Sequence, residues 1–270
     1  MSLTLLQCPA CSAPVRPDKG KNNLFHCPYC GHSGYFQRDD LYEVGAPVTS
    51  GLQYAVDVVL TIDATASMRH LIETVKENAL RFEEDLRQAM QAKGKNVDQL
   101  RVRVVVFRDF YADRKKALQC SEFFELPKEK AEFTKFVGRI HARGGGNLPE
   151  SGLEALATAM DSEWTEAGAK RRHVIVLWTD AGTHPLEKVQ DGRPRHYPAG
   201  MPADLNELTD MWEDQEGQRS RRLILFAPDD YAWDELAAHW SNTIQYPSIA
   251  GQGLSKVDYT TILDAIANSV

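Results

Sequence analysis

Short runs of apolar, mostly β-branched residues alternate with longer segments of helical periodicity from residue 54 onward. Runs of this length and composition are typical of strands that are buried on both faces of a parallel sheet. The clearest are YAVDVVLTI (54–62), LRVRVVVF (100–107), HVIVLWT (173–179) and LILF (223–226). After the first run, apolar residues recur every three or four positions from Met68 to about Gln91, which predicts a long amphipathic helix. The alternation predicts an α/β fold with a doubly wound, mostly parallel sheet over residues 52–270.

The rest of this region continues the series. Further helices are expected near 128–141, 150–160, 204–212 and 233–240 and from about residue 259, with an edge strand at 116–125 and a short strand at 243–246. Ligands of doubly wound folds bind at the carboxyl ends of the strands. The loops expected to carry function therefore follow Ile62, Phe107 and Thr179, together with the loop that enters the helix near Glu150.

Four of the five cysteines form two CxxC pairs, Cys8 with Cys11 and Cys27 with Cys30. A gap of two residues lets both thiolates of a pair face one ion, and two such pairs complete a tetrahedral sulfur shell. The spacing predicts a zinc ribbon over residues 1–45. A segment of this size cannot bury enough apolar surface to fold alone, so the zinc is expected to be structural. GAPVTSG at 45–51 is expected to link the ribbon to the larger domain.

The loop after the first strand carries one carboxylate and two hydroxyl groups in alternation, from Asp63, Thr65 and Ser67. A second carboxylate, Asp180, follows the strand at 173–179 and is expected at the same edge of the sheet. Oxygen ligands of this kind favour Mg²⁺ or Mn²⁺. A helix N-cap favours the same residue types, so capping is the alternative role of either aspartate.

The loop GGGNLPES at 144–151 is expected at the same edge, and its glycines let the backbone approach a ligand closely. Asn147 and Glu150 are its candidate metal ligands, and a plain turn position is the alternative for Asn147. Asp109, Glu150 and His184 are candidate contacts for a partner. For Asp109 the alternative is a salt bridge with its neighbour Arg108, and for His184 a solvated position in the loop.

Three of these segments carry a resemblance. VVLTIDATASM looks like the DxSxS motif of von Willebrand factor A (vWA) domains, with Thr65 in place of the middle serine. VLWTDAG resembles the strand that supplies their second aspartate, and GGGNLPES is similar to the GGGDxPE loop of intracellular members, with Asn147 in place of the aspartate. The matched loops occur in the family's order, and the resemblance covers residues 52–270.

The resemblance implies a metal-ion-dependent adhesion site. Its magnesium ligands would be Asp63, Thr65, Ser67, Asp180 and either Asn147 or Glu150, and one coordination position would stay open for a carboxylate of a partner protein. Together with the zinc ribbon, this is similar to intracellular bacterial vWA proteins such as those associated with tellurite resistance and conflict systems. Such relatives are often encoded beside partner enzymes such as ATPases, kinases or phosphatases, so the resemblance implies a partner of this kind.

Composition narrows the function. A net charge of −7 disfavours general nucleic-acid binding, which needs a cationic surface. No apolar run approaches the roughly 18–20 residues of a membrane span. The start lacks a signal peptide's charged and apolar regions, so a cytoplasmic location without membrane contact is expected. The expected function is therefore a non-enzymatic intracellular adaptor that grips a partner protein through a divalent metal, while the ribbon positions a second contact.

Two other functions are weighed against the adaptor. A metal-dependent phosphatase-like enzyme would use Asp63 as nucleophile, but the second carboxylate that such enzymes need is replaced by Thr65. The chain also lacks a GxxxxGK[ST] nucleotide loop and a GxSxG elbow. The third function is a zinc-ribbon nucleic-acid-binding protein that recruits partners through its vWA domain, and salt-dependent retention on nucleic acid would distinguish it.

Overall fold

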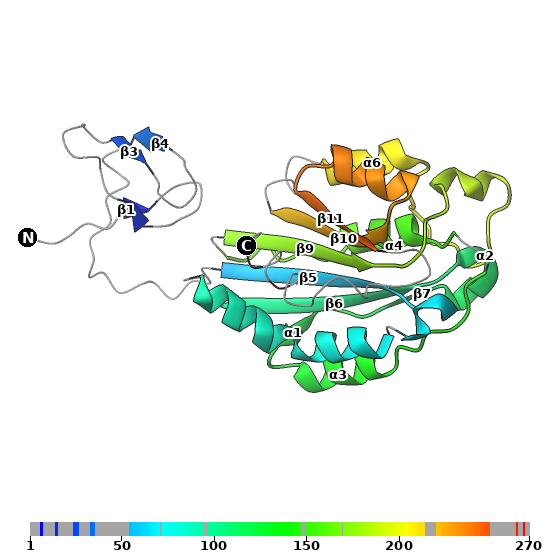
Figure 1. Cartoon of the computed structure of the whole chain (residues 1–270), viewed down its shortest axis with the longest axis horizontal. Coiled ribbons are helices and arrows are strands. Elements are labelled where there is room, and N and C mark those ends of the chain that lie inside the picture. Colours follow the sequence, from blue (N-terminus) through cyan, green and yellow to red (C-terminus); the bar gives the residue numbers. More distant parts are fainter. Residues whose placement is uncertain are drawn as a thin grey trace, which may run out of the picture. The chain divides into compact units, whose positions relative to one another are not determined.

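The computed structural model describes residues 54–70, 72–93, 97–146, 149–168, 170–213 and 220–248, with Leu263, Ala267 and four short strands before residue 36. The chain divides into two compact units, Met1–Gly51 and Leu52–Val270 (Figure 1). No helix in the described part is long and apolar enough to cross a membrane.

The first unit contains two antiparallel pairs of strands. β1 (Leu6–Gln7) pairs with β2 (Pro14–Val15), and β3 (Leu24–His26) pairs with β4 (Ser33–Tyr35). In the sequence, each CxxC pair falls between the two strands of one such pair. The four cysteines themselves, Cys8, Cys11, Cys27 and Cys30, lie outside the described residues. The zinc site and the limits of a ribbon at 1–45 therefore stay predictions.

The second unit is built on a seven-stranded sheet in the order β11-β10-β9-β5-β6-β7, with β8 also paired to β6. Five strands are parallel: β5 (Tyr54–Asp63), β6 (Gln99–Phe107), β9 (Lys170–Trp178), β10 (Arg221–Pro228) and β11 (Thr243–Ser248). The edge strands β7 (Leu118–Cys120) and β8 (Phe124–Leu126) run antiparallel to β6. The doubly wound, mostly parallel α/β fold is confirmed.

The expected edge strand at 116–125 is instead two short strands, and Ser121 is the reason. Its amide donates to the Val104 carbonyl, and its hydroxyl accepts the Val104 amide at 2.9 Å. A side chain thus takes the place of a backbone acceptor, and the regular ladder stops between β7 and β8.

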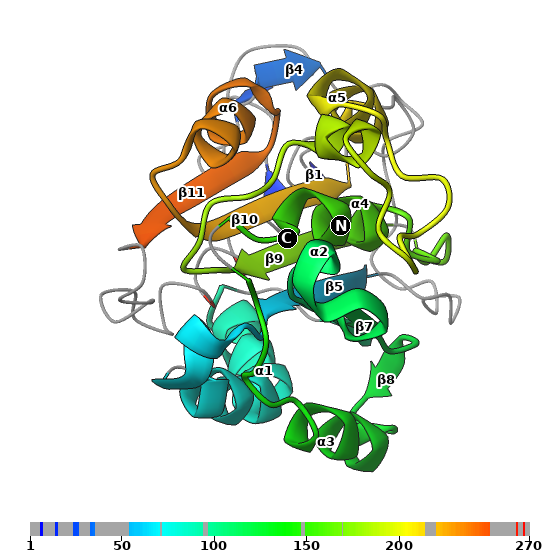
Figure 2. The same ribbon diagram turned by 90° about the vertical axis from the view of Figure 1, so that its right-hand side faces the viewer.

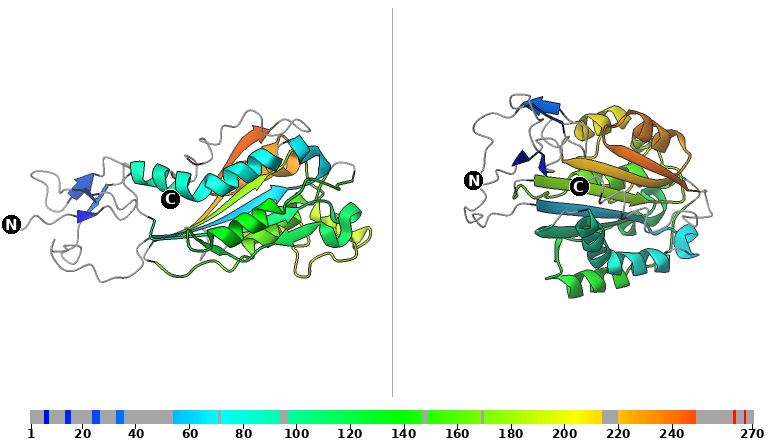
Figure 3. Two further views of the ribbon diagram at one scale, coloured as in Figure 1. Left: turned by 90° about the horizontal axis from the view of Figure 1, so that it is seen from below. Right: turned by 60° about the vertical axis from the view of Figure 1, so that its left-hand side comes forward.

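Helices cover both faces of the sheet (Figure 3). α1 (Ile72–Ala92) and α3 (Lys130–Gly138) pack on one face, where Val58, Leu60 and Ile62 point. α4 (Gly152–Met160), α5 (Leu205–Trp212) and α6 (Tyr231–His239) pack on the other, against residues such as Val59. Because both faces are covered, the central strands are apolar at nearly every position.

The first long helix starts later than its periodicity predicts. Residues Ala66–His70 form a 3-10 helix, and the α-helix begins at Ile72. Of the expected C-terminal helix, Leu263 and Ala267 are described, and both are buried against the α1 face. A short helix, α2 (Phe110–Asp113), follows β6 beyond the carboxyl ends of the strands (Figure 1).

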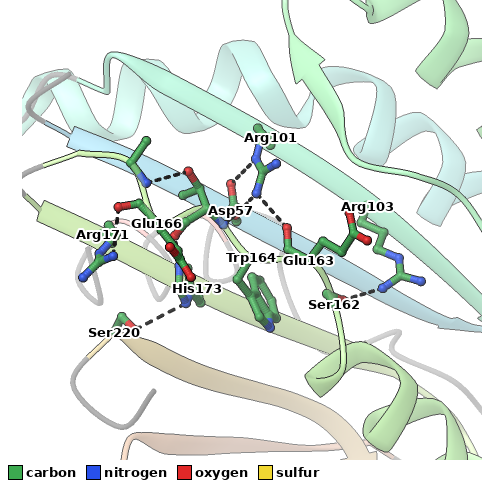
Figure 4. Close-up of polar contacts among 12 residues, drawn as sticks. Asp57, Arg101, Arg103, Ser162, Glu163, Trp164, Glu166, Arg171, His173 and Ser220 are labelled. Atoms are coloured by element: carbon green, nitrogen blue, oxygen red, sulfur yellow. Dashed lines mark hydrogen bonds and ion pairs between the residues drawn. The ribbon is translucent and has the colours of Figure 1, made fainter. Parts of the chain in front are cut away.

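One buried ion pair interrupts the apolar pattern near the amino ends of the strands (Figure 4). Asp57 on β5 is fully buried and accepts two hydrogen bonds from the Arg101 guanidinium, at 2.8 and 2.5 Å. The Thr165 amide donates a third, at 2.7 Å. His173 contacts the Thr165 carbonyl at 3.1 Å, and Trp164 stacks on its ring. These contacts fasten the segment after α4 to the sheet.

Candidate metal centre

The expected ligands converge where the winding of the sheet reverses. β5 and β9 are neighbours at its centre, and the chain leaves them toward opposite edges, to β6 and to β10. Asp63 is the last residue of β5, and Asp180 follows β9 by two residues. Ile62 pairs with Trp178, so the two aspartates leave the sheet at the same level. In open α/β sheets this position is where ligands bind, and Figure 2 looks onto this end of the sheet.

Asp63 is fully buried and held by hydroxyl groups on both sides. Its Oδ1 accepts the Thr65 amide at 2.8 Å and the Thr65 hydroxyl at 2.7 Å. Its Oδ2 accepts the Thr179 hydroxyl at 2.7 Å. Burial raises the pKa of Asp63 to about 6, against the lowering effect of these hydrogen bonds.

Ser67 connects the first loop to the second aspartate. Its hydroxyl lies 3.0 Å from that of Thr65 and donates to Asp180 Oδ1 at 2.9 Å. The bond from the Thr65 amide to Asp63 is one that a cap would make, but the bridge to Asp180 is not explained by capping. The 3-10 helix Leu186–Gln190 has no side-chain cap, so Asp180 does not cap it.

Glu150 lies at the same centre through the loop before α4. Its amide donates to the Gly182 carbonyl at 3.0 Å, and its carbonyl accepts the His184 amide at 2.8 Å. A Cβ at Gly145 would lie 2.8 Å from Glu150 Oε1 and 3.0 Å from Thr65 Cβ, so the three residues are in close contact. Burial raises the pKa of Glu150 to about 8, and the negative charges of Asp63 and Asp109 contribute.

Two carboxylate oxygens of this centre, Asp180 Oδ2 and Glu150 Oε2, are buried and have no hydrogen-bond partner among the described residues. Leaving such groups uncompensated is unfavourable, and a cation would compensate both. The described residues contain no group of three or more His, Cys, Asp or Glu side chains placed to hold a metal together. A site here must therefore combine carboxylates with the Thr65 and Ser67 hydroxyls, a set of hard oxygen donors that fits Mg²⁺ or Mn²⁺.

The candidate ligands thus divide into three groups. The structure brings Asp63, Thr65, Ser67 and Asp180 into one hydrogen-bonded chain. Glu150 adjoins that chain. Asn147 lies outside the described residues, so its choice as a ligand stays a prediction.

Asp109 and His184 form a buried pair beside the centre. Asp109 Oδ1 accepts the Tyr111 amide at 2.9 Å as the cap of α2, and it lies 3.5 Å from His184 Nε2. Burial acts to raise the pKa of Asp109, but hydrogen bonding to His184 and to the Tyr111 amide gives a net lowering. Asp109, Glu150 and His184 are only 3–5% exposed, so His184 is not a solvated loop residue. Their role in contacting a partner stays a prediction.

Sequence reasoning gave no role in the centre to Thr179 and considered a salt bridge for Arg108, yet both residues organise the centre. Thr179 holds Asp63, and its place directly before Asp180 is the only signal the sequence offers. Arg108 makes no salt bridge with Asp109: its guanidinium donates to four backbone carbonyls, those of Ala64, Arg143, Lys116 and His141, at 2.8–2.9 Å. On the far side, the fully buried Trp233 donates its indole N–H to the Ala181 carbonyl at 3.1 Å.

No protein-family model matches the chain. A curated relative, the alpha-protein kinase vwkA of Dictyostelium discoideum, is 27% identical over 158 residues, which are 58% of this chain and 23% of that protein. The chain thus spans less than a quarter of the relative's length.

Solved structures with a similar course of the chain include three proteins. Proximal thread matrix protein 1 from the mussel byssus has a TM-score of 0.45 and 14% identity, over 81% of this chain and 49% of that one. The open conformation of the pilus adhesin SpaC from Lactobacillus rhamnosus GG has a TM-score of 0.47 and 10% identity, over 98% of this chain and 41% of that one. The vWF domain of the pilus tip protein Mfa5 from Porphyromonas gingivalis has a TM-score of 0.46 and 13% identity, over 81% of this chain and 97% of that one. These likenesses concern the fold, and none assigns a function to this chain.

Proposed function

We propose that residues 52–270 form a vWA-type protein-interaction domain that binds an acidic group of a partner protein through Mg²⁺ or Mn²⁺. The observation that supports this most is the pair of buried carboxylate oxygens, Asp180 Oδ2 and Glu150 Oε2, that no described residue satisfies. They adjoin a chain of hydroxyl groups at the position where doubly wound sheets bind ligands.

In this proposal Asp63, Thr65, Ser67, Asp180 and Glu150 hold the ion, with Asn147 as the further candidate. The ion supplies a positive centre that attracts a carboxylate. The Thr65 and Ser67 ligands are neutral, so they leave more of the ion's charge for the partner than carboxylates would. Thr179 and Ser67 keep the two aspartates in place through their hydrogen bonds.

The proposal is non-enzymatic. A phosphatase of the type considered above needs a carboxylate two residues after its nucleophile as general acid. Thr65 occupies that position, and its hydroxyl is bonded to Asp63. A hydroxyl of ordinary acidity is a poor substitute for that acid.

The proposal extends to the whole chain. Cys8, Cys11, Cys27 and Cys30 would hold one structural Zn²⁺, and the ribbon would position a second contact. The location would be cytoplasmic, and the partner would be an enzyme such as an ATPase, kinase or phosphatase. Metal analysis of the purified chain tests the ribbon: one zinc per chain is expected, and its loss from a Cys8→Ser, Cys11→Ser variant.

The metal centre is tested by calorimetric titration of Mn²⁺ into wild type, Asp63→Ala and, as a control, Asp161→Ala, which removes an exposed carboxylate in the turn after α4. Wild type and the control should bind one ion in the second unit, and Asp63→Ala should bind none. Pull-downs from host lysate, in Mg²⁺ and after brief EDTA, then compare the same proteins. A partner retained by Asp63→Ala would refute the metal clasp.

A further inference from the structure

Beside the candidate metal centre lies a group of exposed basic side chains, here called the basic rim. Its members come from two separate segments, the 3-10 helix Arg114–Lys116 that follows α2 and the loop after α3. They are Arg114, Lys115, Lys116, Arg139, His141 and Arg143, all exposed. None of them forms an ion pair within 4.0 Å with another described residue. In a chain of net charge −7, such a concentration of Lys and Arg side chains without an ion-pair partner among the described residues is unusual.

Arg108 brings the two segments together. Its buried guanidinium binds the Lys116 carbonyl from one segment and the His141 and Arg143 carbonyls from the other. One planar group therefore fixes the backbone of both, and the rim is a built feature of the fold. Arg114 adds to this, because it holds a left-handed conformation with φ of 53°, which is unfavourable for a residue other than glycine.

The rim is continuous with the metal centre. The Arg143 amide donates to the Ala64 carbonyl at 2.9 Å, and the Ala66 amide donates to the Gly144 carbonyl at 3.1 Å. Ala64 and Ala66 alternate with the candidate ligands Asp63, Thr65 and Ser67. A segment that placed one side chain on the metal would therefore lie within reach of the rim.

We propose that the basic rim binds an acidic segment of the partner protein, whose further Asp or Glu residues flank the one that reaches the metal. This rests on the proposed function and names the partner's chemistry: a cluster of acidic residues. A protein segment is favoured over a nucleic acid because the adjoining metal accepts a carboxylate.

The test uses the full chain and a fluorescein-labelled oligoglutamate peptide, with oligoglutamine as the uncharged probe, in about 0.15 M salt, where the Debye length is ~8 Å. The rim variant carries Lys115→Gln, Lys116→Gln, Arg139→Gln and Arg143→Gln. A control variant removes the same charge from exposed positions on α1, just after it, just before α3 and at the first residue of α3: Arg81→Gln, Lys93→Gln, Lys128→Gln and Lys130→Gln. Anisotropy measures peptide binding, and a separate Mn²⁺ titration measures the metal centre.

The rim variant should bind oligoglutamate about tenfold more weakly or worse, because several exposed ion pairs are lost together. The control variant should match wild type. Mn²⁺ affinity of the rim variant should not fall, since removing nearby cations does not repel the ion, whereas a merely misfolded centre would lose it. Equal peptide binding by the rim and control variants overturns the proposal.

The experiment can refute the metal-site proposal and the basic-rim proposal independently of each other. If wild type binds oligoglutamate equally with Mg²⁺ and with EDTA while the rim variant does not bind, the metal clasp fails and the rim proposal stands. If binding needs Mg²⁺ but not the rim, the reverse holds. Duplex DNA and unlabelled oligoglutamate are also compared as competitors at equal concentrations of negative charge. If the DNA displaces the labelled peptide at the lower concentration, the rim proposal is overturned in favour of a nucleic acid.

Discussion

At the scale of single residues, the candidate metal centre depends as much on hydroxyl groups as on carboxylates. Thr65 and Thr179 donate to the two oxygens of Asp63, and Ser67 donates to Asp180. Hydroxyls can turn from hydrogen-bond donor to metal ligand without moving the backbone, because only the O–H direction changes. The hydroxyl groups can therefore hold the two aspartates in place when no metal is bound. When a metal binds, the oxygens of Thr65 and Ser67 can act as its ligands.

Replacement of Gly145 tests how closely its loop packs against the candidate ligands Glu150 and Thr65. At φ of +78°, any Cβ there is strained by roughly 1–2 kcal/mol, and it would meet both Glu150 and Thr65. Gly145→Ala should lower the free energy of unfolding by at least about that amount and weaken Mn²⁺ binding. Gly200→Ala is the control, since Gly200 has φ of +73° and open space around its Cβ.

Urea unfolding and Mn²⁺ titration of both glycine variants distinguish strain from contact. Both should lose stability through the backbone, and only Gly145→Ala should lose metal affinity. Equal Mn²⁺ affinity in the two variants would show that the contact between this loop and Thr65 does not shape the centre.

Residue identity and spacing were enough to place Asp63 and Asp180 at one edge of the sheet, because each follows a recognisable buried strand. They were not enough for Arg108 or for the buried state of His184. Both depend on which loops meet in space: Arg108 binds carbonyls up to 44 residues away in the chain, and His184 lies against Asp109. No local pattern carries that information.

At the scale of elements, the buried strands were predicted closely because nearly all of their residues are apolar. The contacts made by the few polar residues within and beside them were not predicted. Asp57 lies within the apolar run of β5, where its charge is balanced by Arg101 on the neighbouring strand. Ser121 divides the expected edge strand by bonding Val104. In both cases a side chain contact across strands, which periodicity does not encode, decides the local structure.

The contacts around Asp57, which include His173, also predict how the stability of the domain changes with pH. Burial lowers the pKa of His173 below its ordinary value of 6.5, the charges of Arg171 and Arg221 add to this, and Asp57 opposes it. The unfolded chain then binds more protons than the folded one as the pH falls through 6.5. The contribution of His173 is therefore complete above that pH and decreases below it, until the folded state is protonated as well.

Urea unfolding between about pH 8 and pH 5 checks this, with His173→Gln as the control that cannot titrate. The difference in unfolding free energy between wild type and variant should shift against wild type as the pH falls. A constant difference across the range would mean that His173 is not kept neutral by its surroundings.

At the scale of the whole molecule, the two units would carry metals of different chemistry. Thiolates favour zinc, and hard oxygen ligands favour magnesium or manganese. Prolonged chelation would remove both ions, so experiments on the second unit need brief chelation or substitution at Asp63.

A bound ion should stabilise the second unit by linkage, since it binds the folded form. Mg²⁺ at 100 times its dissociation constant adds about 2.7 kcal/mol, which for a domain of this size raises Tm by about 5–10 °C. Thermal unfolding with and without Mg²⁺ measures the shift, and Asp63→Ala should show none. The same shift in both proteins would place the ion elsewhere.

The hydrogen bond from Trp233 to the Ala181 carbonyl gives this domain a spectroscopic property of its own. The indole is shielded from water and tied to the residue next to Asp180, so its ultraviolet emission depends on how that turn is held. Occupancy of the site can then be followed in the unlabelled protein by the change in intrinsic fluorescence, and Trp233→Phe, which keeps the other four tryptophans, is the reference that should lose this change.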